Sequence, residues 1–103
     1  MLAHHVYFTL HDDSPPAQDV LVDACKKCLA DHAGIESFAV GRRAAGLERD
    51  VNDQDFHVTL QIVFEDRAAH DAYQADALHN QFIADNKDNW KKVRVFDSDL
   101  SSK

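Results

Sequence analysis

The feature of this sequence that most constrains its fold is a strict alternation of side chains in residues 55–64. Every second position of this segment is apolar, and these positions are Phe56, Val58, Leu60, Ile62 and Phe64. Successive side chains of a β-strand point to opposite faces of a sheet, so the spacing predicts a strand with one wholly apolar face. We expect that face to form the core beneath covering helices.

Three further segments predict strands that can pair with this one. Residues 4–10 alternate in the same way, and residues 35–41 and 92–96 form short runs of strand-forming residues. A polar loop is expected over residues 42–54. A polar tail is expected from about residue 98, after the last strand.

Two segments with helical periodicity separate the strands. The first begins with Ser14 as N-cap and Pro15 at the first helical position, and is expected to stop at Gly34. Its apolar stripe comprises Val20, Leu21, Ala24, Cys25, Cys28 and Leu29. The second begins after Asp66 and is expected to extend to Trp90, with Lys87, Lys91 and Lys92 near its C-terminal end.

The order of these elements is β-α-β-β-α-β. Right-handed crossovers then place both helices on one face of a four-stranded antiparallel sheet. The predicted fold class is therefore α+β of the ferredoxin-like type, and 103 residues accommodate it as a single domain.

Composition and charge argue against several kinds of partner. The net charge is −7 and the basic residues are scattered, whereas sequence-independent nucleic-acid binding needs a basic face. No apolar run has the length of a signal peptide or a membrane span, so a cytoplasmic protein without membrane contact is expected.

The second face of the predicted sheet carries both aromatic and polar side chains. Its expected members are His5, Tyr7, Thr9, His57, Thr59, Gln61, Val63 and Phe96. This surface is too aromatic to meet only water and too polar for the core of a monomer. A second copy that presents the same face resolves the conflict, which predicts a homodimer. The alternative is an amphipathic face in water with a few exposed rings.

The cysteine pair does not predict a redox site. Cys25 and Cys28 have CxxC spacing, but they lie in the middle of a helix and on its apolar stripe. A helix N-terminus would be needed to lower the pKa of such thiols, so both are expected to be buried hydrophobic side chains.

The seven histidines do not form a recognisable ligand set either. No paired HxxxH or second CxxC supports zinc, and only His11 and His57 are expected to approach each other across the sheet. His70 and Asp66, four residues apart, are interpreted as a solvated surface pair. The sequence therefore predicts no metal and no cofactor.

Five segments in this order resemble the stress-responsive A/B barrel domain family. They are HHVYFTLHD, FAVG, FEDRAAHDAY, LHNQF and VRVFD, and they extend over about residues 4–97. The resemblance implies a ferredoxin-like protomer whose sheet pairs with that of a second copy as a dimeric α/β barrel. It implies no single activity, since most members have no assigned reaction. Antibiotic-biosynthesis monooxygenases and haem-degrading enzymes share the wider fold.

The resemblance also implies candidate site residues, through the plant olivetolic acid cyclase of this family. That enzyme uses a histidine after the second helix as base and a tyrosine six residues earlier, and these match His79 and Tyr73. A first-strand histidine matches His4. The third-strand histidine falls at Val58, and the His-Pro step before the base is Asp-Ala here. These departures argue against cyclase activity itself.

The chemistry of these two residues depends on the path of the second helix. A neutral imidazole is a competent general base, and a phenol can polarise a carbonyl oxygen. On an unbroken helix, however, Tyr73 and His79 would lie about 240° apart. They converge only if the helix breaks, and residues 76–78 contain no Pro or Gly to force a break. The alternative is a capping histidine and a core tyrosine.

Two functions remain open. In the first, the dimer holds a small, largely apolar or aromatic ligand between sheet and helices, in a pocket walled by His4, Val6, Phe8, Val58, Leu60 and Phe82. In the second, His79 and Tyr73 perform cofactor-independent acid–base chemistry there, as in a cyclase, lyase or monooxygenase-like enzyme. An open cavity that reaches His79, with Tyr73 directed into it, would favour the second.

Overall fold

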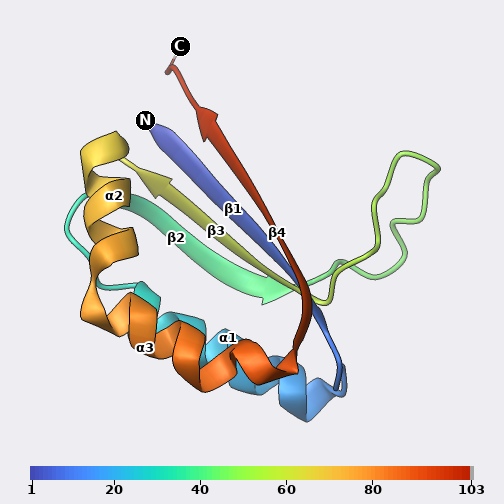
Figure 1. Cartoon of the computed structure of the whole chain (residues 1–103). Coiled ribbons are helices and arrows are strands. Elements are labelled where there is room, and N and C mark those ends of the chain that lie inside the picture. The colour runs from blue at the N-terminus through green and yellow to red at the C-terminus, as the bar shows by residue number, and fades with distance from the viewer. Residues whose placement is uncertain (103) are drawn as a thin grey trace.

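The computed structural model of the protein describes residues 1–102. Its elements are β1 (Leu2–Leu10), α1 (Pro15–Leu29), β2 (Ile35–Arg42), β3 (Val58–Phe64), α2 (Arg67–Ala75), α3 (Ala77–Asn86), the 3₁₀ turn η1 (Lys87–Asn89) and β4 (Trp90–Asp99). The strands form one antiparallel sheet in the order β2-β3-β1-β4. The helices lie on one side of it (Figure 1), which confirms the predicted ferredoxin-like α+β fold.

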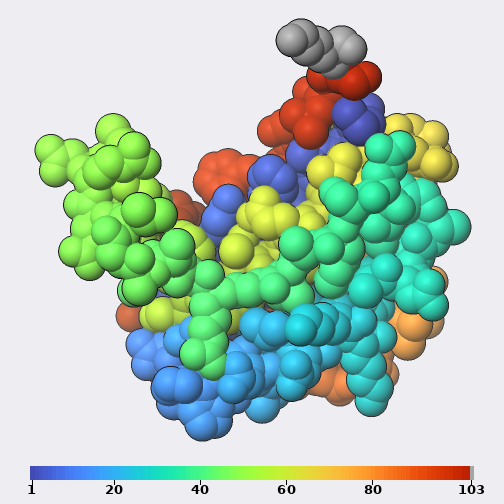
Figure 2. Space-filling view, turned by 180° about the vertical axis from the view of Figure 1, so that it is seen from behind, coloured from blue at the N-terminus to red at the C-terminus, as the bar shows by residue number. Residues whose placement is uncertain are grey.

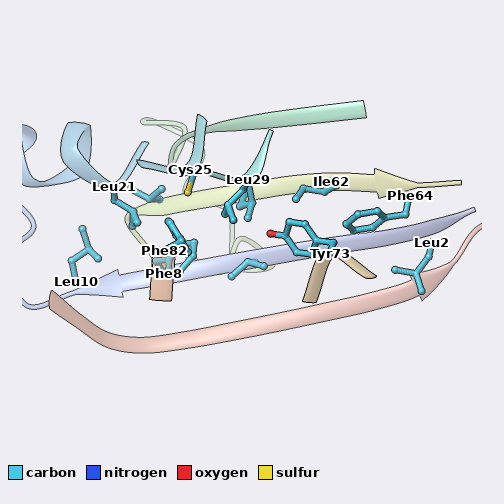
Figure 3. Packing of buried hydrophobic residues seen from close by; sticks show 13 residues of the cluster. Leu2, Phe8, Leu10, Leu21, Cys25, Leu29, Ile62, Phe64, Tyr73 and Phe82 are labelled. Atoms are coloured by element: carbon cyan, nitrogen blue, oxygen red, sulfur yellow. The ribbon is translucent and has the colours of Figure 1, made fainter. Parts of the chain in front are cut away.

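The core lies where the alternation of β3 predicts it. Val58, Leu60, Ile62 and Phe64 are at most 2% exposed, and they pack against apolar side chains of β1, α1, α2 and α3 (Figure 3). Full burial of each such side chain stabilises the fold by roughly 1.5–3 kcal/mol. These four residues anchor the helices to the sheet.

Phe56, the fifth member of the predicted apolar face, is placed differently. The chain turns at residue 57, so β3 begins only at Val58 and the alternation does not extend upstream. The Phe56 ring packs against Tyr7, on the face of the sheet opposite the helices, with ring centroids 4.9 Å apart. The prediction that Phe56 belongs to the core face is wrong.

Helix α1 begins as predicted and buries a narrower stripe than expected. The Ser14 hydroxyl accepts a hydrogen bond from the Ala17 N–H at 3.4 Å, as an N-cap does. Leu21, Cys25 and Leu29 form the buried stripe at i, i+4 and i+8. Val20 is 64% exposed, because it lies one residue, or about 100°, away from this stripe. The helix ends at Leu29, well before Gly34.

The second predicted helical segment is divided. Asp76 has an extended backbone, with φ −68° and ψ 143°, and separates α2 from α3. Its carboxylate accepts a hydrogen bond from the Leu78 N–H at 2.8 Å and thereby caps α3.

The last strand is longer at both ends than the sequence indicated. β4 pairs with β1 from Trp90, opposite Leu10, to Asp99, opposite Leu2. Trp90 and Lys91 therefore lie in a strand, and their assignment to the end of the second helix is wrong, whereas Lys92 lies in the strand as predicted. The strand also includes the first residues of the expected polar tail.

The connection between β2 and β3 projects from the body of the molecule (Figure 1). Residues 43–57 form this loop, which we call the projecting loop. The Arg43 guanidinium closes its base by donating hydrogen bonds to the carbonyls of Gln54, at 2.7 Å, and Phe56, at 3.2 Å. Seen from behind, the loop stands beside the exposed strands with a hollow between them (Figure 2).

Within residues 1–102, no helix combines the length and the apolar character that crossing a bilayer requires.

Gly34 provides a test of how α2 packs on the turn before β2. It has φ 85°, and a Cβ there would lie 2.4 Å from the Ala69 Cβ. Gly46 has φ 82° with nothing within 4 Å, so Gly46→Ala measures the backbone strain alone, about 1–2 kcal/mol. We expect Gly34→Ala to lower the free energy of unfolding in urea by a further ~1–3 kcal/mol through overpacking. Ala69→Gly in that background should recover most of the difference, and equal losses in the two alanine variants would contradict this contact.

Candidate functional site

The break at Asp76 brings Tyr73 and His79 together. Their ring centroids lie 4.8 Å apart with an interplanar angle of 68°, an edge-to-face contact. Both side chains are buried, at 2% and 9% exposure. The sequence left this convergence undetermined, because it depends on a helix end that an aspartate forms.

A cavity of about 170 Å³ lies between the sheet and helices α2 and α3, and Tyr73 and His79 are part of its wall. Five of the six expected wall residues line it, namely His4, Val6, Phe8, Leu60 and Phe82. Val58 does not line it and is fully buried in the core. In Figure 3 the Tyr73 hydroxyl points away from Phe64 and toward the side of the core that holds Phe8 and Phe82.

Several residues of this cavity are not predicted by the sequence pattern. Gln74 contributes from α2, and Trp90, Val93 and Val95 contribute from β4. The sequence pattern predicts a helix at Trp90. It therefore does not predict that the Trp90 ring lies beside the Phe8 ring, with the two centroids 5.0 Å apart.

Two nitrogen atoms of the cavity wall have no hydrogen-bond partner in the part of the chain that the structure describes. They are His79 Nδ1 and Trp90 Nε1, and both are buried. Leaving a buried polar atom unsatisfied costs about 1–3 kcal/mol. The mostly apolar residues that line the cavity therefore include two with an unsatisfied buried nitrogen.

Burial also sets the protonation of the two rings. The pKa of His79 is lowered, first by burial and then by repulsion from the His4 and His32 imidazoles. Burial raises the pKa of the Tyr73 phenol. At neutral pH the site therefore holds a neutral imidazole that can accept a proton, beside a phenol that keeps its own.

His4 lies at one end of the cavity in a cluster that the sequence did not reveal. Its Nδ1 is 2.5 Å from Asp97 Oδ1, and burial lowers its pKa even though Asp97 opposes this shift. The His70 ring lies 5.1 Å from the His4 ring. The predicted surface pair of His70 with Asp66 is wrong, because Asp66 caps α2 through the Ala69 N–H and His70 packs toward the sheet against Phe64.

On the face of the sheet opposite the helices, which we call the outer face, most of the predicted residues lie together. The Gln61 amide donates to the Tyr7 hydroxyl at 3.3 Å and to the Thr59 hydroxyl at 2.6 Å. Phe96 packs on Tyr7 and remains 51% exposed. His5 pairs with Gln61 and Phe96 across the neighbouring strands, and Val63 pairs with Ala3.

Thr9 and His57, also predicted for this face, are engaged within the chain. The Thr9 hydroxyl donates to the Asp55 carbonyl at 2.9 Å, and the side chain is buried. His57 Nδ1 accepts a hydrogen bond from the Leu10 N–H at 3.0 Å, and its Nε2 is 3.2 Å from an Asp13 oxygen. Both lie where the projecting loop returns to the sheet.

The hollow between the outer face and the projecting loop has a volume of about 460 Å³. Arg94 of β4 spans it by donating to an Asp53 oxygen at 2.7 Å, and its guanidinium lies 6.0 Å from the Phe96 ring centroid. The contact of Arg94 with Asp53 at this surface is not predictable from the sequence, because the path of a polar loop carries no periodic signal.

The cysteines are placed as predicted. Cys25 is completely buried, and burial raises the pKa of its thiol to about 12. Cys28 is half-buried beside the core, and neither forms a disulfide within residues 1–102.

The fold and this cavity define the chain as a ferredoxin-like α+β protein with a small cavity between sheet and helices. The family model described as Stress responsive A/B Barrel Domain matches residues 2–100. The chain therefore belongs to the stress-responsive A/B barrel domain family, as the sequence resemblance indicated.

Solved structures show the same fold at low sequence identity. A family member from Mesorhizobium loti has a TM-score of 0.78 at 23% identity, covering 98% of this chain and 97% of its own. A dimeric ferredoxin-like protein of unknown function from Thermobifida fusca has a TM-score of 0.79 at 17% identity, and the match covers 96% of this chain and 90% of that protein. A hydroxynitrile lyase from Passiflora edulis has a TM-score of 0.77 at 13% identity, and the match covers 99% of this chain and 94% of that enzyme. The comparison with curated proteins finds no match.

The cap at Asp76 can be tested against the cap at Asp66. Each carboxylate accepts one N–H at a helix start, from Leu78 and Ala69, both at 2.8 Å. We expect Asp76→Ala and Asp66→Ala each to lower the free energy of unfolding by about 1 kcal/mol. Only Asp76→Ala should weaken the nuclear Overhauser contact between the Tyr73 and His79 rings. An undiminished contact in that variant would show that Asp76 does not hold the break.

Proposed function

We propose that the protein is a homodimer in which each protomer binds a small, largely apolar or aromatic compound in the cavity between sheet and helices. The observation that carries this proposal is the pair of unsatisfied nitrogens, His79 Nδ1 and Trp90 Nε1, in an otherwise apolar wall. Ligand sites typically combine apolar walls with a few such polar groups, which fix orientation.

The volume limits the size of the ligand. At about 170 Å³ the cavity is close to the engineered protein cavity of about 150 Å³ that accepts benzene. It is smaller than the ~300 Å³ at which sites for drug-sized molecules begin. We therefore expect a compound with a single ring or a short branched chain.

The two polar atoms indicate which hydrogen-bonding groups the ligand carries. The Trp90 indole N–H can only donate, so it calls for an acceptor such as a carbonyl oxygen. His79 Nδ1 can accept or donate, depending on its tautomer. A monocyclic aldehyde, ketone or phenol satisfies both.

The outer face supports the homodimer. It carries Phe96 at 51% exposure on β4, while Tyr7, Gln61 and Val63 extend the surface across β1 and β3. The related Thermobifida fusca protein is described as dimeric. Two outer faces stacked about a two-fold axis would remove these rings from water, with each hollow open to the partner.

A second candidate function is acid–base catalysis in the same cavity, favoured by the 4.8 Å contact of Tyr73 with His79. Neutral His79 would accept a proton from a hydroxyl or an acidic C–H of the substrate, and the Tyr73 hydroxyl would donate a hydrogen bond to the substrate's oxygen. The proton held on His79 would return to the leaving group. The related Passiflora edulis protein is a hydroxynitrile lyase, which is consistent with this chemistry on a small compound.

Thermal shift with phenol, benzaldehyde and similar single-ring compounds tests the cavity. A ligand that binds only the native state raises stability by about 2.7 kcal/mol at 100 times its Kd. Val93→Phe should fill the cavity mouth and abolish the shift. Val20→Phe, a matched change on the exposed side of α1, should retain it. Equal shifts in both variants would exclude the cavity as the site.

The same compounds separate the two candidate functions. If the protein only binds them, His79→Ala and Tyr73→Phe change affinity and no product is formed by the wild type. If it is an enzyme, both variants lose turnover while Val20→Phe retains it. Unchanged turnover in His79→Ala would remove the catalytic assignment.

The homodimer is tested by light scattering at micromolar concentration. We expect a dimer for the wild type and a monomer for Val63→Asp, because the two-fold axis would bring buried carboxylates close together. Val20→Asp introduces the same charge on α1 and should remain a dimer. A monomeric wild type, or a dimeric Val63→Asp, would contradict the outer face as the interface.

A further inference from the structure

Three metal-binding side chains from three elements meet beside the cavity. His4 lies in β1, His70 in α2 and Asp97 in β4. One ligand atom of each lies within 4.8 Å of the other two. The residues are separated by up to 93 positions in the chain, so the fold alone assembles them.

The hydrogen bond between His4 and Asp97 does not explain why His70 also lies at this place. His70 sits on the inner side of α2, with its ring 5.1 Å from the His4 ring and 16% side-chain exposure. Two imidazoles and one carboxylate converging in this way form a ligand set typical of divalent transition metals.

The far side of each imidazole also has a partner, as metal-binding histidines require. His70 Nδ1 lies 3.0 Å from Asp71 Oδ1, so its proton is held there and Nε2 keeps a free lone pair. His4 Nε2 lies 3.5 Å from the Gln74 amide. The oxygen and nitrogen of an amide exchange places when the group is flipped, so the Gln74 amide oxygen can accept a hydrogen bond from an N–H at this position.

We propose that His4, His70 and Asp97 bind one divalent transition-metal ion per protomer, of which Zn²⁺ is the representative. Three protein ligands leave at least one coordination position for water or a ligand, as in sites of the two-histidine, one-carboxylate kind. The inference does not depend on the proposed function of the cavity.

Binding requires only small movements. Ligand atoms about 2.0–2.1 Å from zinc lie about 3.4 Å apart in a tetrahedral site, so the cluster contracts slightly around the ion. Asp97 and His70 are partly exposed and can rotate toward the buried His4. The His4 proton moves from Nδ1, where it is hydrogen-bonded to Asp97, to Nε2, where it can be hydrogen-bonded to the Gln74 amide oxygen.

The ion would join the first strand, the last strand and α2, the helix that carries Tyr73. Since His4 also belongs to the cavity wall, an ion there would fix the end of the cavity at which His4 lies.

Calorimetric titration with Zn²⁺ tests the site, on untagged protein freed of metal with a chelator. We expect saturable binding of one ion per protomer. His70→Gln and Asp97→Asn should each weaken it by roughly tenfold or more. His11→Gln removes an exposed histidine outside the cluster and should change nothing. Absence of saturable binding, or equal affinity in all three variants, overturns the proposal.

A second measurement does not rely on the variants. In histidine-selective NMR of the wild type, Zn²⁺ should shift the ring signals of His4 and His70 and leave those of His11 unchanged. The ion should also raise the melting temperature, and excess chelator should reverse this. Shifts confined to other histidines would overturn the site even if zinc binds elsewhere.

Discussion

The pairing of β1 with both β3 and β4 is the constraint on which the rest of the molecule depends. Because β1 lies in the interior of the sheet, its alternation assigns each of its own side chains to the cavity or to the outer face. His4, Val6 and Phe8 face the helices, and His5 and Tyr7 face outward. A slip of one residue in this register would exchange the two sets and remove the cavity wall and the outer face together.

The cavity exists because two short helices replace one long one. A continuous helix would direct Tyr73 and His79 to different sides, whereas the cap at Asp76 lets α3 start in a new direction. The rings meet where burial favours the neutral imidazole. Both rings line the cavity, so the break at Asp76 determines which groups its wall contains.

Features that depend on neighbouring residues were predictable from the sequence. The alternation of β3 from Val58 onward and the caps at Ser14 and Asp66 are local, and the structure has them as expected. The break at Asp76 was not predictable, since an aspartate between helical residues caps a new helix only if packing favours the turn. The cluster of His4, His70 and Asp97 depends on the register of strands at opposite ends of the chain, which no local pattern specifies.

The position of β1 in the sheet has a consequence for how the chain acquires its structure. The first strand has no neighbour from the first half of the sequence, since both strands that flank it come from residues 58–64 and 90–99. Its pairing with β3 can form once residues 58–64 are available, but its second edge stays open until residues 90–99 join it. Closing such long loops is slow, and an open strand edge is exposed to aggregation in the meantime. In this topology an interior strand therefore completes its hydrogen bonding only through the last element of the sheet.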